Sequence, residues 1–233
     1  MTEVPVITVD GPSGTGKGTV CSILATKLRW HLLDSGSLYR VLALSAIKAD
    51  VGFDDESALV ALVSSMTLSF ATSEENNLVR IFLNKQDVSD DIRSESCGNA
   101  ASLVAALPGV RQALLERQRA FMQPPGLVAD GRDMGTIVFP AAELKIFLTA
   151  SAEERASRRY KQLKEKGISV NLRDLSADIV ERDRRDKERA ASPLKPADDA
   201  VTIDTTEIQI EQVMSQISAL VEQRFPGSAD FTH

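Results

Sequence analysis

Apolar and β-branched residues gather in short runs that alternate along the chain with segments of helical periodicity. The runs predict strands at residues 4–9, 31–34, 126–130, 144–149 and 201–204, and those at 4–9 and 126–130 are expected to be buried. Between them, apolar residues recur at helical spacing, at 19–30, 41–48, 94–106, 110–121 and 208–225. This alternation predicts an α/β fold with a parallel sheet and helices on both faces. Function is then expected at the carboxyl ends of the strands.

Between residues 50 and 93 the pattern changes. Short β-forming runs at 67–71, 79–84 and 86–88, with a polar turn at 73–77 between the first two, predict a small antiparallel insert. The pattern alone leaves two interpretations open for this insert, a functional element or a surface decoration.

Composition narrows the class of protein but not its chemistry. The chain has 233 residues, 43% hydrophobic and 26% charged, which excludes wholesale disorder. No apolar run approaches the ~20 residues of a membrane span, and the N-terminus does not resemble a secretory signal. Two cysteines form neither a disulfide framework nor a metal-binding spacing. A formal net charge of −6 argues against coating of nucleic acid. We therefore expect a cytoplasmic protein with neither a nucleic-acid nor a membrane partner.

The first strand leads into a G-x-x-x-x-G-K sequence and then a helix, the context of a phosphate-binding loop. Backbone N–H groups of such a loop face an anion, and the lysine reaches the outer phosphates of ATP. A glycine-rich turn with a solvated lysine is the alternative. The predicted ATP-binding residues are Gly11, Pro12, Ser13, Gly14, Thr15, Gly16, Lys17, Gly18 and Thr19.

Magnesium is the cofactor expected beside such a loop. Gly18 occupies the position where a serine or threonine hydroxyl usually holds Mg²⁺. Either Thr19 or ordered waters must then replace that hydroxyl. Asp130, at the end of a predicted strand, is the expected acidic partner, through water.

Residues 153–189 form a basic island, with twelve Lys/Arg and nine Asp/Glu in a chain of net charge −6. Arg155, Arg158 and Arg159 fall within about one helical turn. Mixed charges at such spacings most often only solvate a helix, and we expect that of Arg158, Arg184 and Lys187. Beside a phosphate loop, however, the other arginines suit phosphoryl transfer, which requires cations around several oxygens.

Five motifs together resemble the bacterial cytidylate kinase family. They lie at residues 11–19, 34–40, 99–102, 129–136 and 182–189, and the similarity extends from residue 4 to about 224. The G-K-G-T variant of the loop is one associated with nucleoside monophosphate kinases. The resemblance implies transfer of a phosphoryl group from ATP to CMP or dCMP, with Mg²⁺, in a cytoplasmic monomer.

The resemblance also implies roles for individual residues. Ser102, Arg111 and Asp133 would read the cytosine edge, Asp186 with Arg182 would hold the sugar hydroxyl, and Arg40 with Arg132 would grip the α-phosphate of CMP. The full set of implied CMP-binding residues is Ser35, Tyr39, Arg40, Ser102, Arg111, Arg132, Asp133, Arg182, Asp186 and Arg189. The implied catalytic residues are Lys17, Arg132, Arg155 and Arg159, although the choice among Arg155, Arg158 and Arg159 stays open.

The same resemblance predicts how one kinase unit is divided. A core would comprise residues 1–49, 110–150 and 168–225, a nucleoside monophosphate-binding region with the β insert 50–109, and a lid 151–167.

Two other functions remain as alternatives. One is a kinase for UMP or a hydroxyl-bearing metabolite. The other is a nucleotide-dependent switch, since residues 84–87 read N-K-Q-D, the form of a guanine-reading motif. That motif lies in the β-rich polar insert rather than at the end of a core strand, which argues against the switch.

Overall fold

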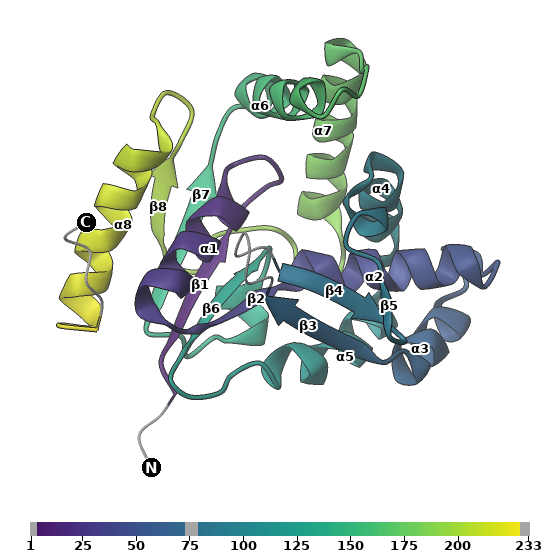
Figure 1. Ribbon diagram of the computed structural model, residues 1–233, viewed down its shortest axis with the longest axis horizontal. Helices are drawn as coiled ribbons and strands as arrows, with labels where there is room; N and C mark the ends of the chain where they lie inside the picture. Colours follow the sequence, from purple (N-terminus) through teal and green to yellow (C-terminus); the bar gives the residue numbers. More distant parts are fainter. Residues whose placement is uncertain (1–3, 73–78, 229–233) are drawn as a thin grey trace. The chain divides into compact units, whose positions relative to one another are not determined.

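The computed structural model describes residues 4–72 and 79–228, and the chain divides into two compact units (Figure 1). Unit 1 comprises Met1–Asp34 and Gln118–His233, and unit 2 comprises Ser35–Arg117. Among the described residues, no helix is both long and apolar enough to cross a membrane.

Unit 1 is built on a five-stranded parallel sheet in the order β2-β6-β1-β7-β8, which confirms the predicted fold class. Its strands are β1 (Val6–Asp10), β2 (His31–Asp34), β6 (Leu127–Gly131), β7 (Leu144–Thr149) and β8 (Val201–Asp204). In the register of the sheet, Asp130 is the partner of both Val9 and Asp34. The ends of β2, β6 and β1 therefore lie level, and the residues that follow them share one edge of the sheet.

Helices α1 (Lys17–Leu28) and α8 (Ile210–Arg224) pack on the sheet through one continuous core cluster. In α8 the buried positions Val213, Ile217 and Val221 recur every four residues, so that one stripe of the helix faces the core. A capping box of Gln209 and Gln212 begins this helix. Close by in sequence, Phe225 meets the Trp30 ring edge-on at 5.3 Å between centroids. The core thus fixes α1, and with it the loop that precedes this helix.

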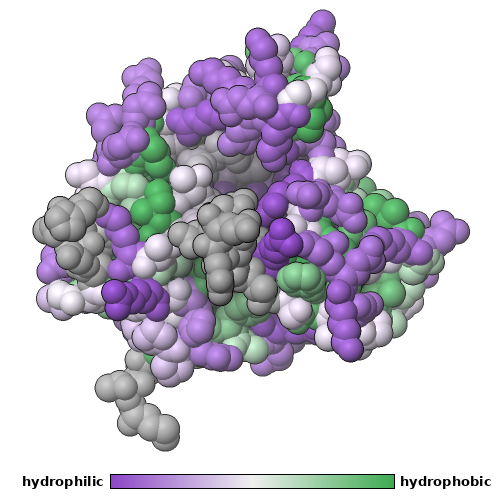
Figure 2. All heavy atoms as spheres, in the orientation of Figure 1, coloured by the Kyte–Doolittle hydropathy of each residue, from purple (hydrophilic) through white to green (hydrophobic). Residues whose placement is uncertain are grey.

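Two charged helices, α6 (Ala152–Glu165) and α7 (Leu172–Glu188), follow β7. Each begins at a side-chain cap: Ser151 Oγ accepts from the Glu154 N–H at 3.1 Å, and Asn171 Oδ1 accepts from the Arg173 N–H at 2.9 Å. Each helix has only two or three buried residues, and Figure 2 shows hydrophilic side chains covering the region of α6 at the top of the view. These helices present charge rather than a wide apolar face.

Unit 2 contains α2 (Ser35–Lys48), α3 (Glu56–Ser65), η1 (Asp91–Arg93) and α4 (Glu95–Val104), while α5 (Pro108–Arg119) runs to its boundary. A separate antiparallel sheet of β3 (Leu68–Thr72), β4 (Val79–Leu83) and β5 (Gln86–Asp87) confirms the predicted insert. The polar turn expected at 73–77 lies outside the described residues.

In unit 2 two helices begin at other residues than predicted, and a third helix was not predicted. Helix α2 begins at Ser35 rather than residue 41, so the polar run before Arg40 is its first turns. Helix α5 begins at Pro108, because proline fits the first helical position, where no intrahelical N–H is needed. Helix α3 was not predicted. It buries only Leu59 and Val63, and its signals are that spacing and an N-cap in which Asp55 Oδ1 accepts from the Ala58 N–H at 3.0 Å.

In the N-K-Q-D segment, Asn84 and Lys85 form the turn between β4 and β5, and Gln86 and Asp87 are β5 itself. Asn84 and Lys85 have φ of 49° and 70°, the left-handed conformation that a tight hairpin requires. Asn84 Oδ1 accepts from the Thr67 N–H at 2.9 Å, and Asp87 accepts from the Ser89 hydroxyl at 2.6 Å. These contacts explain the motif as hairpin chemistry, on a different sheet from the phosphate loop.

Candidate active site

The glycine-rich segment forms a tight loop between β1 and α1. Gly16 has φ of 91° and is the N-cap of α1, so the helix N-terminus opens directly onto the loop. A side chain at Gly11 would place its Cβ 2.0 Å from the Leu148 carbonyl oxygen on β7. The loop therefore depends on glycine both for its conformation and for its close approach to the sheet, as a phosphate-binding loop does.

Lys17 is buried, and its ammonium donates to the Pro12 carbonyl at 2.6 Å. Burial, together with the charge of nearby Arg132, lowers the pKa of Lys17 from 10.5 to about 7, although Asp130 opposes the shift. Burial likewise raises the pKa of Asp130 from 3.8 to about 7, against the attraction of Lys17. The Lys17 ammonium and the Asp130 carboxylate thus lie together in one buried region at the ends of β1 and β6. An incoming phosphate would favour the charged form of Lys17.

Asp10, the last residue of β1, is also buried and accepts two backbone hydrogen bonds. Its carboxylate receives the Met134 N–H at 2.9 Å and the Gly135 N–H at 2.8 Å. Burial raises the pKa of Asp10 from 3.8 to about 6, although both hydrogen bonds lower it. The two donors begin η2 (Met134–Val138), a π-helical turn just after Arg132 and Asp133. Asp10 was not among the predicted site residues; its signal in the sequence was an acidic residue at the end of a buried strand.

The residues predicted for CMP in unit 1 are brought together around α7. Arg132 Nε donates to Asp186 Oδ2 at 3.0 Å, and the Asp186 side chain is 8% exposed. Burial would raise the pKa of Asp186, but the charges of Arg132, Arg182 and Arg189 outweigh it and lower that pKa. The result is a buried carboxylate that stays ionised among three guanidinium groups. Asp133 is buried as well.

The three arginines of α6 have different surroundings. Arg155 is buried and bonded to Ser13, Ala150 and Asp183. Arg159 contacts Gln162 at 3.3 Å near the surface.

The prediction that Arg158 only solvates its helix is wrong. Its guanidinium donates to the Thr205 hydroxyl at 3.1 Å and to the Thr205 carbonyl. It is also paired with Glu154 at 2.8 Å. Arg184, in contrast, is exposed, and its ion-pair partners among the described residues are Glu181 and Glu188 of its own helix, as expected of a solvating charge.

A cavity of about 580 Å³ lies beside the phosphate loop. It is lined by loop residues Thr15, Gly16 and Thr19, by α6 and by the segment after β8. Thr205 in that segment donates to the Thr15 carbonyl at 3.3 Å and so joins it to the loop. This segment was not predicted to belong to the site. The signal available was its place after a predicted core strand, at the edge where ligands bind in such sheets.

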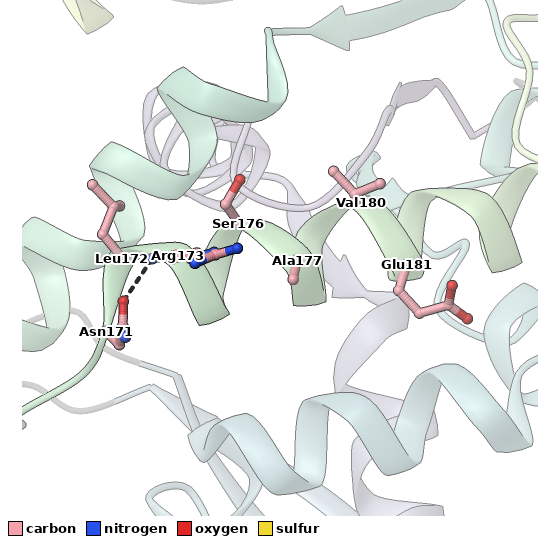
Figure 3. Close-up of a pocket in the computed structure, with 7 residues that line it drawn as sticks. All are labelled: Asn171, Leu172, Arg173, Ser176, Ala177, Val180 and Glu181. Atoms are coloured by element: carbon pink, nitrogen blue, oxygen red, sulfur yellow. Dashed lines mark hydrogen bonds between the residues drawn. The ribbon is translucent and has the colours of Figure 1, made fainter.

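A second, shallow depression follows α7. Figure 3 shows seven side chains of this helix and its N-cap along it, with Asn171 bonded to the backbone of Arg173. The lining includes the exposed apolar residues Leu172 and Val180. It contains none of the predicted site residues.

In unit 2 the predicted CMP-binding residues lie on α2, α4 and α5. Arg111 is buried and its guanidinium lies 5.6 Å from the centre of the Tyr39 ring, a cation–π contact. Ser102 is buried too, and its Oγ has no hydrogen-bond partner within the described parts of the chain. A buried hydroxyl without a partner is costly unless a ligand or water completes it. Ser35, the first residue of α2, is also buried.

Arg40 has a structural contact in unit 2. Its guanidinium donates to the Ile92 carbonyl at 2.7 Å and approaches the Ser94 carbonyl at 3.4 Å. Gly98 allows this approach, since a Cβ there would lie 3.1 Å from the guanidinium nitrogens. Arg40 thus anchors α2 to the start of α4.

A phosphate loop between a buried strand and a helix, with charged groups at the carboxyl edge of a parallel sheet, defines a P-loop nucleotide-binding protein. The protein-family model described as cytidylate kinase matches residues 7–223. The chain belongs to the cytidylate kinase family.

Curated relatives agree with that family. The chain is 60% identical to a cytidylate kinase of Shewanella frigidimarina over 94% of this chain and 96% of the relative. It is 58% identical to a cytidylate kinase of Aeromonas hydrophila, over 94% and 95%. A cytidylate kinase of Pseudomonas putida is 56% identical, over 95% and 97%. The similarity therefore covers nearly the full length of both partners in each comparison.

Proposed function

We propose that this chain is a nucleoside monophosphate kinase that transfers the γ-phosphoryl group of ATP to CMP and dCMP, forming ADP with CDP or dCDP. The observation that carries the proposal is the cytidylate kinase match over residues 7–223, on a chain whose phosphate loop is fully formed. The alternative acceptors, UMP or a hydroxyl-bearing metabolite, have no comparable support.

The donor nucleotide binds at the phosphate loop in this proposal. Loop N–H groups and the N-terminus of α1 receive the β- and γ-phosphates, and Lys17 exchanges its contact with Pro12 for a phosphate oxygen. The cavity beside Thr15 and Thr205 has room for the nucleoside of ATP. Lys17, Arg132 and Arg159 then stabilise the charge that spreads over the transferring group.

The residues present fit a magnesium ion that arrives with ATP. Among the described residues no cluster of three or more acidic, histidine or cysteine side chains could hold a metal alone. Mg²⁺ in kinases is typically held by one or two carboxylates together with substrate phosphates and waters. A Cβ at Gly18 would lie 3.6 Å from Asp130 Oδ2, so the glycine leaves open space beside that carboxylate. We propose Asp130 and Thr19 as the holding residues, through water; bound there, Mg²⁺ would neutralise phosphate charge.

The acceptor nucleotide needs recognition of a base, a sugar and one phosphate. Asp186, kept ionised by Arg132, Arg182 and Arg189, suits the sugar hydroxyl as a hydrogen-bond acceptor. Arg132 has further N–H groups for the α-phosphate. Asp133, and in unit 2 the buried Ser102 and Arg111, are the proposed readers of the cytosine edge; Ser35, Tyr39 and Arg40 complete the proposed set. No general base is required, because the attacking atom is already a phosphate oxygen.

We further propose that residues 151–167 act as a lid over the donor, in a monomeric cytoplasmic enzyme without nucleic-acid or membrane partners. The family resemblance supports the lid, the monomer and the cytoplasmic location, and the net charge of −6 argues against a nucleic-acid partner. Sedimentation of the purified chain with and without ATP tests the monomer: a concentration-dependent dimer would contradict it.

A substrate panel tests the function directly. The purified chain is assayed with ATP, Mg²⁺ and each of CMP, dCMP, UMP, AMP and GMP, with Lys17→Met as the matched control for contaminating kinases. We expect CMP and dCMP to be phosphorylated much faster than the others. Equal turnover of all five would refute base recognition but keep a kinase, whereas ATP hydrolysis without any acceptor product would refute the kinase.

A further inference from the structure

Arg155 connects three elements of unit 1 through one buried guanidinium group. Its side chain is 3% exposed. Nε donates to the Ala150 carbonyl at 3.0 Å, just after β7, and Nη1 donates to the Ser13 carbonyl of the phosphate loop at 3.1 Å. Nη1 and Nη2 also donate to the two carboxylate oxygens of Asp183 on α7, at 3.0 and 2.5 Å. The phosphate loop, the sheet edge and α7 are therefore joined at one residue.

These contacts leave little of Arg155 for a substrate. A guanidinium group has five N–H donors in a fixed planar fork, and protein acceptors take four of them here. Only one N–H, on Nη2, remains, and offering a phosphoryl group more than that would require breaking the forked pair with Asp183, whose side chain is itself only 15% exposed. Breaking a buried pair leaves an uncompensated charge, which is strongly unfavourable.

The elements that Arg155 joins carry the two halves of the proposed reaction. Ser13 lies in the donor loop, and a Cβ at Gly14 would be 3.1 Å from Arg155 Cβ, so the arginine stem packs directly on that loop. On α7, Asp186 follows Asp183 by three residues, which places both on one face of the helix. Asp186 holds Arg132 at 3.0 Å. A continuous set of contacts thus runs from the donor loop to the proposed acceptor residues.

We infer that Arg155 is a positioning residue: with Asp183 it fixes the phosphate loop relative to α7, and it does not touch the transferring phosphoryl group. The inference rests on the proposed kinase function and assigns to Arg155 a role other than the one implied by sequence resemblance. It also assigns a role to Asp183, which sequence analysis did not single out.

A double-mutant cycle tests the inference through kcat. Arg155→Lys loses the fork and Asp183→Asn loses the charge, so both break the same link. We expect each to lower kcat with CMP by about 10- to 100-fold, the scale of a small misplacement of reacting groups. The double variant should be no slower than the slower single variant, because the link is already lost.

Two outcomes of the cycle overturn the inference. If Arg155 touched the phosphoryl group, Arg155→Lys would lower kcat, whereas Asp183→Asn would leave kcat unchanged or raise it. The kcat change of the double variant would then be the product of the changes in the two single variants. If the pair only held the fold together, the variants would melt at lower temperature while kcat per folded molecule stayed that of the wild type. Arg184→Gln is the control on the same helix, because Arg184 is exposed and, in the part of the chain that the structure describes, pairs with Glu181 and Glu188 of that helix. The kcat of this variant should not change.

A further variant keeps the test valid if Arg155→Lys or Asp183→Asn does not fold. Arg155→Met with Asp183→Leu replaces the ion pair by apolar side chains, a change that proteins often tolerate without loss of stability. This variant should fold and still show the lowered kcat. Wild-type kcat in it would overturn the inference.

Calorimetric titration with ATP separates this inference from the proposed function, because binding requires no acceptor. Both Arg155→Lys and Asp183→Asn should weaken ATP binding to a similar degree, about tenfold. Wild-type ATP affinity in both would overturn the inference. A wild-type chain that binds ATP but does not phosphorylate CMP would refute the proposed function and leave the comparison of affinities intact.

Discussion

Replacement of Asp10 by asparagine should change how the stability of the protein depends on pH. The Asp10 carboxylate is buried at the end of β1 and accepts the N–H groups of Met134 and Gly135. Burial raises its pKa from 3.8 to about 6. Between these values the folded state binds more protons than the unfolded chain, so the free energy of unfolding falls as the pH rises. Asparagine does not titrate, and the variant lacks this dependence.

The magnitude follows from the difference between the two pKa values. One pKa unit corresponds to about 1.4 kcal/mol, so ionised Asp10 costs about 3 kcal/mol of stability well above its folded pKa. Roughly 1 kcal/mol of that cost is already present at about pH 4.5, because the unfolded group ionises there. The stability of Asp10→Asn minus that of the wild type should therefore rise by about 2 kcal/mol between about pH 4.5 and about pH 7.5.

Urea unfolding of the wild type and Asp10→Asn across this pH range measures the difference. At every pH Asp10→Asn also loses a hydrogen bond, because its amide NH₂ faces an N–H donor, and this lowers its stability by a constant amount. The test is therefore the change with pH in the stability difference between the variant and the wild type. In Asp204→Asn, a variant in the same unit, the stability difference should change with pH in the opposite direction. The hydrogen bonds from Thr206 lower the pKa of Asp204, so the stabilising contribution of this carboxylate is present at high pH and lost as the pH falls. Parallel stability curves for the wild type and Asp10→Asn would refute the reasoning.

Three further outcomes follow from the same region. Gly11→Ala should destabilise the fold by about 2–5 kcal/mol, because its Cβ would meet the Leu148 carbonyl at 2.0 Å; Gly18→Ala, whose nearest contact is 3.6 Å, is the thermal-melting control and should lose nothing. When ADP binds without metal near pH 7, the protein should take up protons, since phosphate raises the pKa of buried Lys17 from about 7. Calorimetry in buffers of different ionisation enthalpy measures this uptake, and an uptake of zero would contradict the prediction. Asp186→Asn should raise KM for CMP while leaving ATP affinity nearly unchanged, and an equal loss of both would contradict its acceptor role.

The parallel sheet was predictable because its central strands β1, β6 and β7 are rich in apolar and β-branched residues, whereas the edge strands β2 and β8 are short and mostly exposed. The antiparallel insert was predictable for the same reason, from β-formers separated by polar turns. Helix α3 was not, because it buries only Leu59 and Val63 and so has a weak period. The start of α2 was missed because serine and glycine at 35–37 resemble a turn, although these residues are its first helical turn.

The candidate site was predictable where a motif dictates backbone geometry, as in the phosphate loop. The contacts of long side chains in the site were less predictable, because the spacing of charges along the sequence does not specify which acceptor each arginine reaches. Arg155 and Arg158 share one turn of α6, yet one bonds to Ser13 and Asp183 and the other to Thr205. Only tertiary contacts distinguish them. The cavity beside Thr205 was missed for a related reason, since residues after β8 carry no motif of their own.

The arginine contacts of α6 also set the mechanics of this part of unit 1. Arg155 and Arg158 attach the first half of α6 to the phosphate loop and to Thr205, and Asp183 attaches the last turns of α7 to Arg155. The rest of α6, from Arg158 to Glu165, spans about 10 Å at 1.5 Å per residue and packs on α7, with Leu163 buried. A tilt of about 20° about Arg158 would therefore move the end of α6, together with the part of α7 that packs on it, by roughly 4 Å. In such a tilt Lys161 and Lys164 would move most, while Arg155 would keep its contact with the Ser13 carbonyl.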